Sequence, residues 1–99
     1  MKIRLIGTAE RELEEALAWY AEKAADLESK FLDEVSHAKG RILEHPNAWH
    51  PLGAAIRRFR LDRFPYGLIY LVTQTEIVVV AIAHLHRKPD YWRDRLPKC

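Results

Sequence analysis

The sequence IRRFRLDRFPYGLIYLVTQTEIVVVAIAH, residues 56–84, determines the fold class because it contains three segments with the side-chain pattern of β-strands. These strands are predicted over residues 56–61, 66–73 and 77–84. In the first strand, Arg58 and Arg60 alternate with apolar residues, so we expect the two arginines on one face of a sheet. The last strand begins with seven apolar residues in a row, which predicts a central place in that sheet.

The preceding half of the chain has the period of two α-helices. Two apolar stripes recur at positions i, i+4, i+7 and i+11: Leu13, Leu17, Tyr20 and Ala24, then Phe31, Val35, Ala38 and Ile42. We expect Thr8 to cap the first helix and the pair of His45 and Pro46 to end the second. Since few residues separate the stripes, the helices are predicted to form an antiparallel hairpin.

The remaining segments complete an α+β prediction. Residues 2–6 are a short strand candidate, residues 47–55 a loop, and the tail after Pro89 a final helical turn. The order is therefore β-α-α-β-β-β in a single domain over residues 1–99, with the helical hairpin packed on one face of a small, mainly antiparallel sheet. We expect the other face to be open and to carry arginines.

Composition predicts an ordinary globular protein. Of the 99 residues, 48% are hydrophobic and 30% charged, and no apolar run approaches the length of a membrane span. The N-terminus has no apolar signal-peptide core, so we expect neither secretion nor membrane insertion, and a cytoplasmic location. The lone cysteine, Cys99, cannot by itself form a zinc site, and we expect no metal and no cofactor.

Charge is divided unevenly along the chain. Residues 1–50 carry seven lysines and arginines against ten acidic residues, whereas residues 51–99 carry nine against four. The concentration of cations in the second half favours a surface that meets phosphates or an acidic partner.

Several short motifs carry a family resemblance. The sequence LEEALAWY at residues 13–20, placed on the first helix of this order of elements, resembles the RelE/ParE superfamily of bacterial toxin–antitoxin systems. More specific motifs follow in the second half: RRF at 57–59, RFPYGLIY at 63–70, AIAH at 81–84 and RKPDYWRDR at 87–95. Together they resemble the ParE-like branch, whose members are often called plasmid stabilisation proteins.

The resemblance implies a growth-inhibiting toxin that a cognate antitoxin neutralises. It leaves two targets open, because characterised ParE members inhibit DNA gyrase whereas RelE-like members are ribosome-dependent messenger-RNA endoribonucleases. RelE-like nucleases usually present lysines along the middle strands, but this chain has none between Lys39 and Lys88. Arginine stabilises charge and is a poor base, so the sequence favours the ParE-like inhibitor and leaves open whether the protein is an enzyme.

Candidate site residues follow from both interpretations. For RNA cleavage, the acid, base and charge-stabilising groups would come from His84, His86, Arg87 and Tyr91. Phosphate or target binding would use Arg57, Arg58, Arg60 and Arg63. Apolar residues beside the helical stripes, which the family interpretation assigns to antitoxin binding, are Trp19, Leu32 and Leu43. Structural roles remain alternatives: His84 as a hydrogen-bonding core residue, Tyr91 as a hydrophobic plug.

Overall fold

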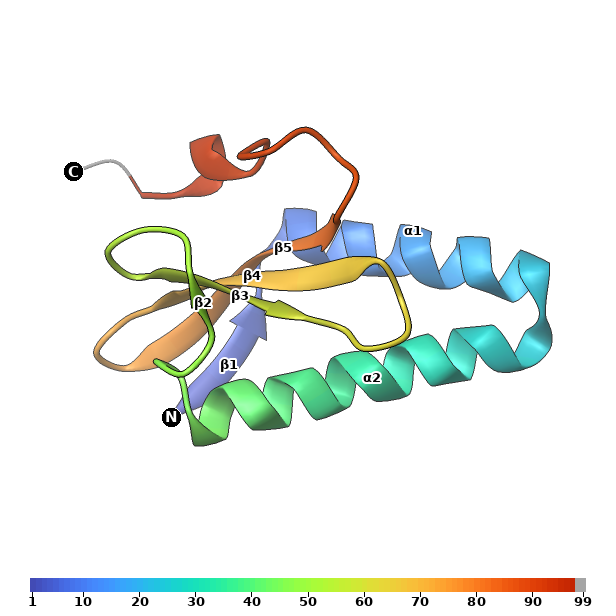
Figure 1. Cartoon of the computed structure of the whole chain (residues 1–99), viewed down its shortest axis with the longest axis horizontal. Coiled ribbons are helices and arrows are strands. Elements are labelled where there is room, and N and C mark those ends of the chain that lie inside the picture. Colours follow the sequence, from blue (N-terminus) through green and yellow to red (C-terminus); the bar gives the residue numbers. More distant parts are fainter. Residues whose placement is uncertain (98–99) are drawn as a thin grey trace.

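A computed structural model describes residues 1–97 and shows two helices against a five-stranded sheet (Figure 1). In chain order the elements are β1 (Lys2–Leu5), α1 (Gly7–Lys23), α2 (Ala25–Glu44), β2 (His50–Pro51), β3 (Ile56–Arg60), β4 (Tyr66–Val72), β5 (Glu76–His84) and a 3-10 turn (Arg93–Arg95). The predicted α+β order is confirmed, with β2 as an additional short strand. Within residues 1–97, no helix combines the length and the hydropathy needed to cross a membrane.

The sheet order is β1-β5-β4-β3-β2, so β5 lies between two other strands as its apolar sequence predicts. β1 pairs with β5 in parallel, and the other neighbours are antiparallel. A register shift opposite Ile69 and Tyr70 inserts an extra residue in β5. Val80 and Ala81 consequently pack on the same face, away from the helices. Both faces of β5 therefore contribute to apolar clusters, and the bulge changes which of its residues face the helices after Val80.

The helical hairpin covers one face of the sheet. Every residue of the predicted stripe in α2 is buried, namely Phe31, Val35, Ala38 and Ile42, and the helix ends at Glu44 as expected. In α1 the buried residues are Ala9, Ala16 and Tyr20, while Leu13 and Leu17 pack at the margin of the same core. Ala24 lies between the helices in an extended conformation, where it starts α2 and does not extend the stripe.

The prediction of Thr8 as the cap of α1 is wrong. The helix begins at Gly7 after Ile6, whose side chain makes no capping hydrogen bond. Ile6 is still part of the sheet region, since its N–H donates to the carbonyl of Val79 at 3.0 Å. The strand therefore passes directly into the helix, and sheet pairing sets the helix start in place of a polar cap.

Two further expectations need correction. The predicted loop 47–55 contains β2, whose two residues pair with Arg57 and Arg58 of β3. The second sheet face is not open: Trp92, 4% exposed, packs over it in a second apolar cluster that also contains Ile56, Ile69, Val78, Val80, Ala81 and Ala83. The chain after β5 thus covers the middle of this face, while Arg58 and Arg60 of β3 and Arg4 of β1 lie toward its edges.

Candidate functional site

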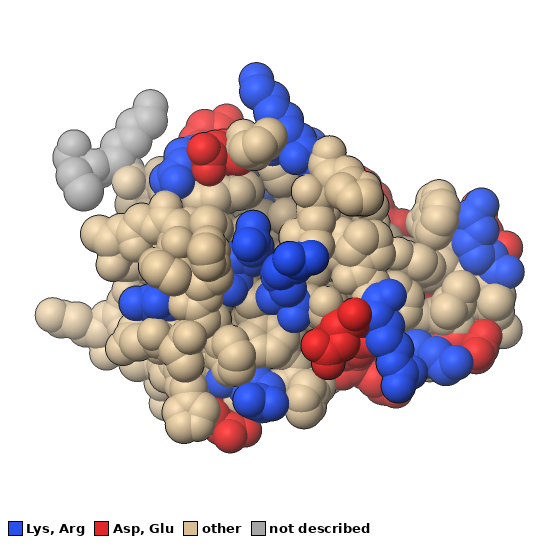
Figure 2. All heavy atoms as spheres, viewed as in Figure 1, with Lys and Arg blue, Asp and Glu red and all other residues tan. Residues whose placement is uncertain are grey.

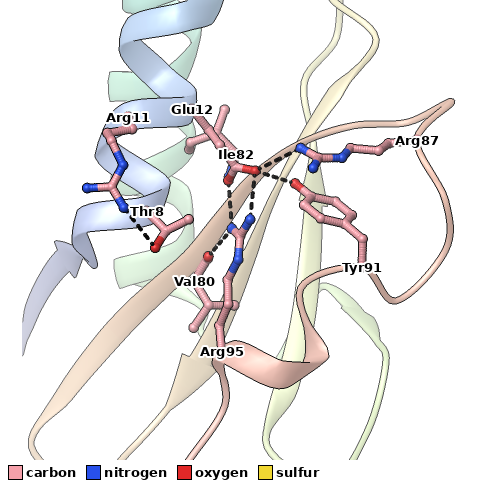
Figure 3. A network of polar contacts seen from close by, with 8 residues as sticks. All are labelled: Thr8, Arg11, Glu12, Val80, Ile82, Arg87, Tyr91 and Arg95. Atoms are coloured by element: carbon pink, nitrogen blue, oxygen red, sulfur yellow. Dashed lines mark hydrogen bonds and ion pairs between the residues drawn. The ribbon is translucent and has the colours of Figure 1, made fainter.

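A largely buried carboxylate, Glu12 of α1 with an 11% exposed side chain, organises the polar contacts at one end of the sheet (Figure 3). Its Oε1 accepts hydrogen bonds from the Ile82 N–H at 3.1 Å and from Arg95 Nη1 at 2.8 Å. Its Oε2 accepts from the Tyr91 hydroxyl at 2.7 Å, from Arg95 Nη2 at 3.1 Å and from Arg87 Nη1 at 3.3 Å. One side chain therefore joins α1, β5 and the C-terminal segment.

The location of this network follows from the lengths of the strands. β1 ends at Leu5, so the rest of the β5 edge has no strand beside it. There, Glu12 accepts from the Ile82 N–H, and Arg95 Nη1 donates to the Val80 carbonyl at 2.9 Å. The two side chains replace the missing strand and satisfy its hydrogen-bonding partners.

Two of the predicted catalytic residues are occupied by this network. The Tyr91 hydroxyl donates a hydrogen bond to Glu12. The pKa of Tyr91 is raised above its ordinary value, mainly by burial and next by this hydrogen bond. The guanidinium of Arg87 pairs with Glu12 and lies 3.8 Å from the centroid of the Tyr91 ring. Tyr91 is therefore poorly suited to act as a base, and the charge of Arg87 already has a partner.

The two candidate histidines are neighbours at the end of β5. His84 Nδ1 accepts a hydrogen bond from the His86 N–H at 3.1 Å, and the two rings are 5.2 Å apart. The His84 ring also packs edge-on against Tyr66 at 5.0 Å. His84 is half-buried and borders one surface hollow with Arg87, whereas His86 is exposed and borders a different one. Three of the four predicted catalytic residues, His84, Arg87 and Tyr91, thus line a common hollow of about 180 Å³, and only His86 borders a separate one.

Three of the four predicted phosphate-binding arginines come together. Arg58, Arg60 and Arg63 line a hollow of about 530 Å³ next to His86. Arg57 is separate, because it points to the helix side of β3 and donates Nη1 to the Trp49 carbonyl at 2.8 Å. Alternation along the strand, apparent in the sequence, explains why Arg57 and Arg58 lie on opposite faces.

The predicted antitoxin-binding residues differ in exposure. Trp19 and Leu32 are 52% and 45% exposed, whereas Leu43 is half-buried against the main core. Trp19 borders a hollow of about 490 Å³ between α1 and the sheet, which Tyr20 and Tyr66 also line. Exposed aromatic surface beside such a hollow is typical of a docking site for another protein.

A family model described as the ParE toxin of type II toxin–antitoxin system, parDE, matches residues 3–89. This chain belongs to the ParE toxin family. It is therefore the toxin component of a type II toxin–antitoxin system, and membership implies a cognate antitoxin as its partner.

Individual relatives of this ParE-family toxin agree with that assignment. It is 32% identical over 93 residues to Toxin ParE2 of Mycobacterium tuberculosis, in both strain CDC 1551 / Oshkosh and strain H37Rv. Each match covers 90% of this chain and 86% of the relative. A solved structure, the chromosomal ParDE toxin–antitoxin system from P. aeruginosa, has a TM-score of 0.74 at 16% identity, covering 87% of this chain and 97% of that one. This likeness supports the same fold.

Sequence reasoning missed the role of Glu12 in this ParE-family toxin. The residue lies in a run of acidic residues near the start of α1, which looks like a solvated helix face. Its partners are 70 or more positions away in the chain, so no local spacing reveals them. No group of metal-ligating side chains suitable for an ion is found among residues 1–97, and Cys99 lies outside the described residues.

Proposed function

We propose that this ParE-family toxin arrests growth in the cytoplasm by binding and inhibiting DNA gyrase, with no RNA cleavage of its own. The observation that carries the proposal is the Glu12 network. It engages Arg87 and Tyr91, two of the four groups that a metal-independent ribonuclease would draw from this chain. Membership of the ParE family supports the same conclusion.

The chemistry of RNA cleavage makes this argument specific. Attack by a ribose 2′-hydroxyl on the adjacent phosphate needs a base to take the proton and an acid for the leaving oxygen. Arginine remains protonated, and the raised pKa of Tyr91 removes that hydroxyl as a base near neutral pH. Both roles would fall to His84 and His86, which border different hollows.

The alternative is a ribosome-dependent messenger-RNA endoribonuclease of the RelE type. It is favoured by the exposed His86 beside Arg58, Arg60 and Arg63, because a histidine next to cations is suited to acid–base work on a phosphodiester. This alternative requires His86, whereas inhibition by binding does not. A single substitution of His86 therefore distinguishes the two functions.

The test is expression of the toxin without antitoxin, comparing wild type with His84→Gln, His86→Gln and the exposed-surface control His45→Gln. Primer extension on abundant messages detects RNA cleavage, while chromosome breakage and a supercoiling assay with purified gyrase detect the other function. We expect intact messages with every variant, and damaged chromosomes and inhibited gyrase with wild type, His84→Gln and His45→Gln. Cuts within translated messages that disappear in His86→Gln but persist in His45→Gln would refute the proposal.

For neutralisation, we propose that the antitoxin covers the hollow beside Trp19 and extends over Leu32. The exposure of these two apolar side chains on the hairpin supports this, since a partner segment gains most by covering large residues that the toxin leaves in water. Leu43 would contribute less because it already packs against the core. In this arrangement the antitoxin and the arginines of β3 occupy different surfaces.

A further inference from the structure

We propose that Arg58, Arg60, Arg63 and His86 form a binding site for the sugar–phosphate backbone of nucleic acid, here named the arginine hollow. The inference deepens the proposed function, because gyrase works on DNA and an inhibitor with this site would contact the DNA together with the enzyme. It rests on that function only for the choice of DNA as the ligand, since the phosphate chemistry is a property of the hollow itself.

Arg58 is the most constrained member of the arginine hollow. Its aliphatic part crosses β4 over Gly67, where an added Cβ would lie only 3.1 Å from Arg58 Cγ. Its Nε is buried and has no hydrogen-bond partner among residues 1–97. A buried donor without a partner is costly, so a phosphate oxygen that reaches Nε would remove a penalty as well as add a contact.

The loop that carries Arg63 is fixed from two sides. Glu34 of α2 accepts hydrogen bonds through Oε1 from the N–H groups of Asp62 and Arg63, at 3.0 and 3.2 Å. On the other side, the Leu85 N–H donates to the Pro65 carbonyl at 2.8 Å, which places the start of the C-terminal segment beside the loop. The hollow is thus assembled before any ligand arrives, which lowers the entropic cost of binding.

The arginine hollow differs from the rest of the basic half in having unpaired charge. Arg87 and Arg95 pair with Glu12, and Arg93 pairs with Asp90. Asp62 also lines the hollow, but none of its three arginines has a carboxylate of residues 1–97 within ion-pair distance. On the face shown in Figure 2, lysine and arginine side chains gather near the middle of the molecule.

Nucleic acid fits this surface better than an acidic peptide does. Guanidinium groups match the oxygens of a phosphate, and the exposed His86 ring beside them can stack on a base. The buried apolar members of the lining, Leu61 and Phe64, offer little surface to anchor the side chains of a peptide. Exposed anchors for a peptide lie at Trp19, on the other hollow.

The experiment measures binding of fluorescein-labelled oligonucleotides to the purified full chain by fluorescence anisotropy. One sequence is used as duplex DNA, single-stranded DNA and single-stranded RNA, at salt concentrations from about 50 to about 200 mM. The variant is Arg60→Ala/Arg63→Ala, and the control, Lys2→Ala/Arg11→Ala, removes the same charge at exposed positions outside the hollow. Circular dichroism and thermal unfolding verify that both variants are folded.

We expect the hollow variant to bind at least about tenfold more weakly than wild type at low salt. The slope of log K against log salt should also fall by between about one and about two, whereas the control changes little. Tighter binding of either DNA form identifies DNA as the source of the phosphates, and tighter binding of RNA identifies RNA. Equal binding by variant and control would overturn the proposal.

Two further results separate this proposal from its alternatives. If the hollow variant binds oligonucleotides normally but loses affinity for the antitoxin, the arginines form an acidic-peptide site and the nucleic-acid proposal is wrong. If wild type inhibits gyrase while binding no oligonucleotide, the phosphate site is refuted and the gyrase function stands. If it binds oligonucleotides through the hollow without inhibiting gyrase, the phosphate site stands and the gyrase target is refuted.

Discussion

Replacing Glu12 by glutamine tests whether its network holds the C-terminal segment on the sheet. Glu12 and Arg95 have side chains only 11% and 15% exposed, so both charges depend on each other for compensation. Glutamine keeps an oxygen for the Ile82 N–H but removes the negative charge. It also turns an NH₂ group toward donors such as the Tyr91 hydroxyl.

The expected loss of stability can be worked from these contacts. Removing one member of a buried ion pair costs about 3–5 kcal/mol, because the remaining charge stays buried without compensation. We take the lower end, about 3 kcal/mol, because Arg95 keeps its hydrogen bond to the Val80 carbonyl. For a domain of this size that corresponds to a fall in Tm of roughly 12 °C or more.

The assay is urea unfolding followed by tryptophan fluorescence, with hydrogen exchange of residues 87–96 as a local measurement. The control is Glu14→Gln, an exposed substitution two positions along the same helix, which should leave the unfolding free energy nearly unchanged. We expect amides of the C-terminal segment to lose protection first in Glu12→Gln. A loss of unfolding free energy no larger than that of Glu14→Gln would show that the Glu12 network makes no net contribution to stability.

Four other substitutions have directions that the structure determines. Gly67→Ala should destabilise the fold by about 1–3 kcal/mol, since the new Cβ would crowd Arg58 and a backbone carbonyl 3.3 Å away. Gly40→Ala has open space around the new Cβ in a helix, so it should stabilise the fold by about 0.5–1 kcal/mol. Chemical denaturation measures both changes in unfolding free energy, and two changes of the same sign would contradict the packing argument. Trp19→Ala should weaken antitoxin binding at least tenfold with little change in Tm, as calorimetric titration would measure, and unchanged affinity would exclude that docking surface. Burial raises the pKa of Tyr70 to about 12, so its neutral form stabilises the fold fully below about pH 10, and that contribution falls as pH rises toward 12. In Tyr70→Phe, urea midpoints measured between these pH values should therefore decline less than in wild type.

The elements that the sequence predicted well are those with a strong and uninterrupted pattern. The apolar stripe of α2 and the apolar run of β5 predict burial directly, because every position of each pattern carries an apolar side chain. Threonine is a common N-cap residue, so the sequence predicts a helix start at Thr8. The helix instead begins directly after Ile6, because the pairing of Ile6 with β5 determines where the strand ends. The two residues of β2 carry no strand pattern of their own and form a strand only because β3 lies beside them.

The candidate site was partly predictable for the same reason. Alternation along β3 placed Arg58 and Arg60 on one face, but the sequence could not show that Arg57 would bind the Trp49 carbonyl. Nor could it show that Tyr91 would donate to Glu12, because the partners lie at opposite ends of the chain. Contacts between distant segments depend on the finished topology, which local spacing does not contain.

The pairing of β1 with β5 bears on when the protein can become harmful during its synthesis. Lys2 lies opposite Glu76, and Arg4 Nε contacts the carboxylate of Glu76 at 2.9 Å. The first strand therefore has no pairing partner until the last strand has been synthesised. A ribosome delivers residues one after another from the N-terminus, and long-range pairing of this kind is slow to form. The sheet cannot close until nearly the whole polypeptide has been made. We therefore expect a nascent or prematurely terminated chain that lacks β5 to be inactive, so that growth inhibition would begin only when translation is essentially complete.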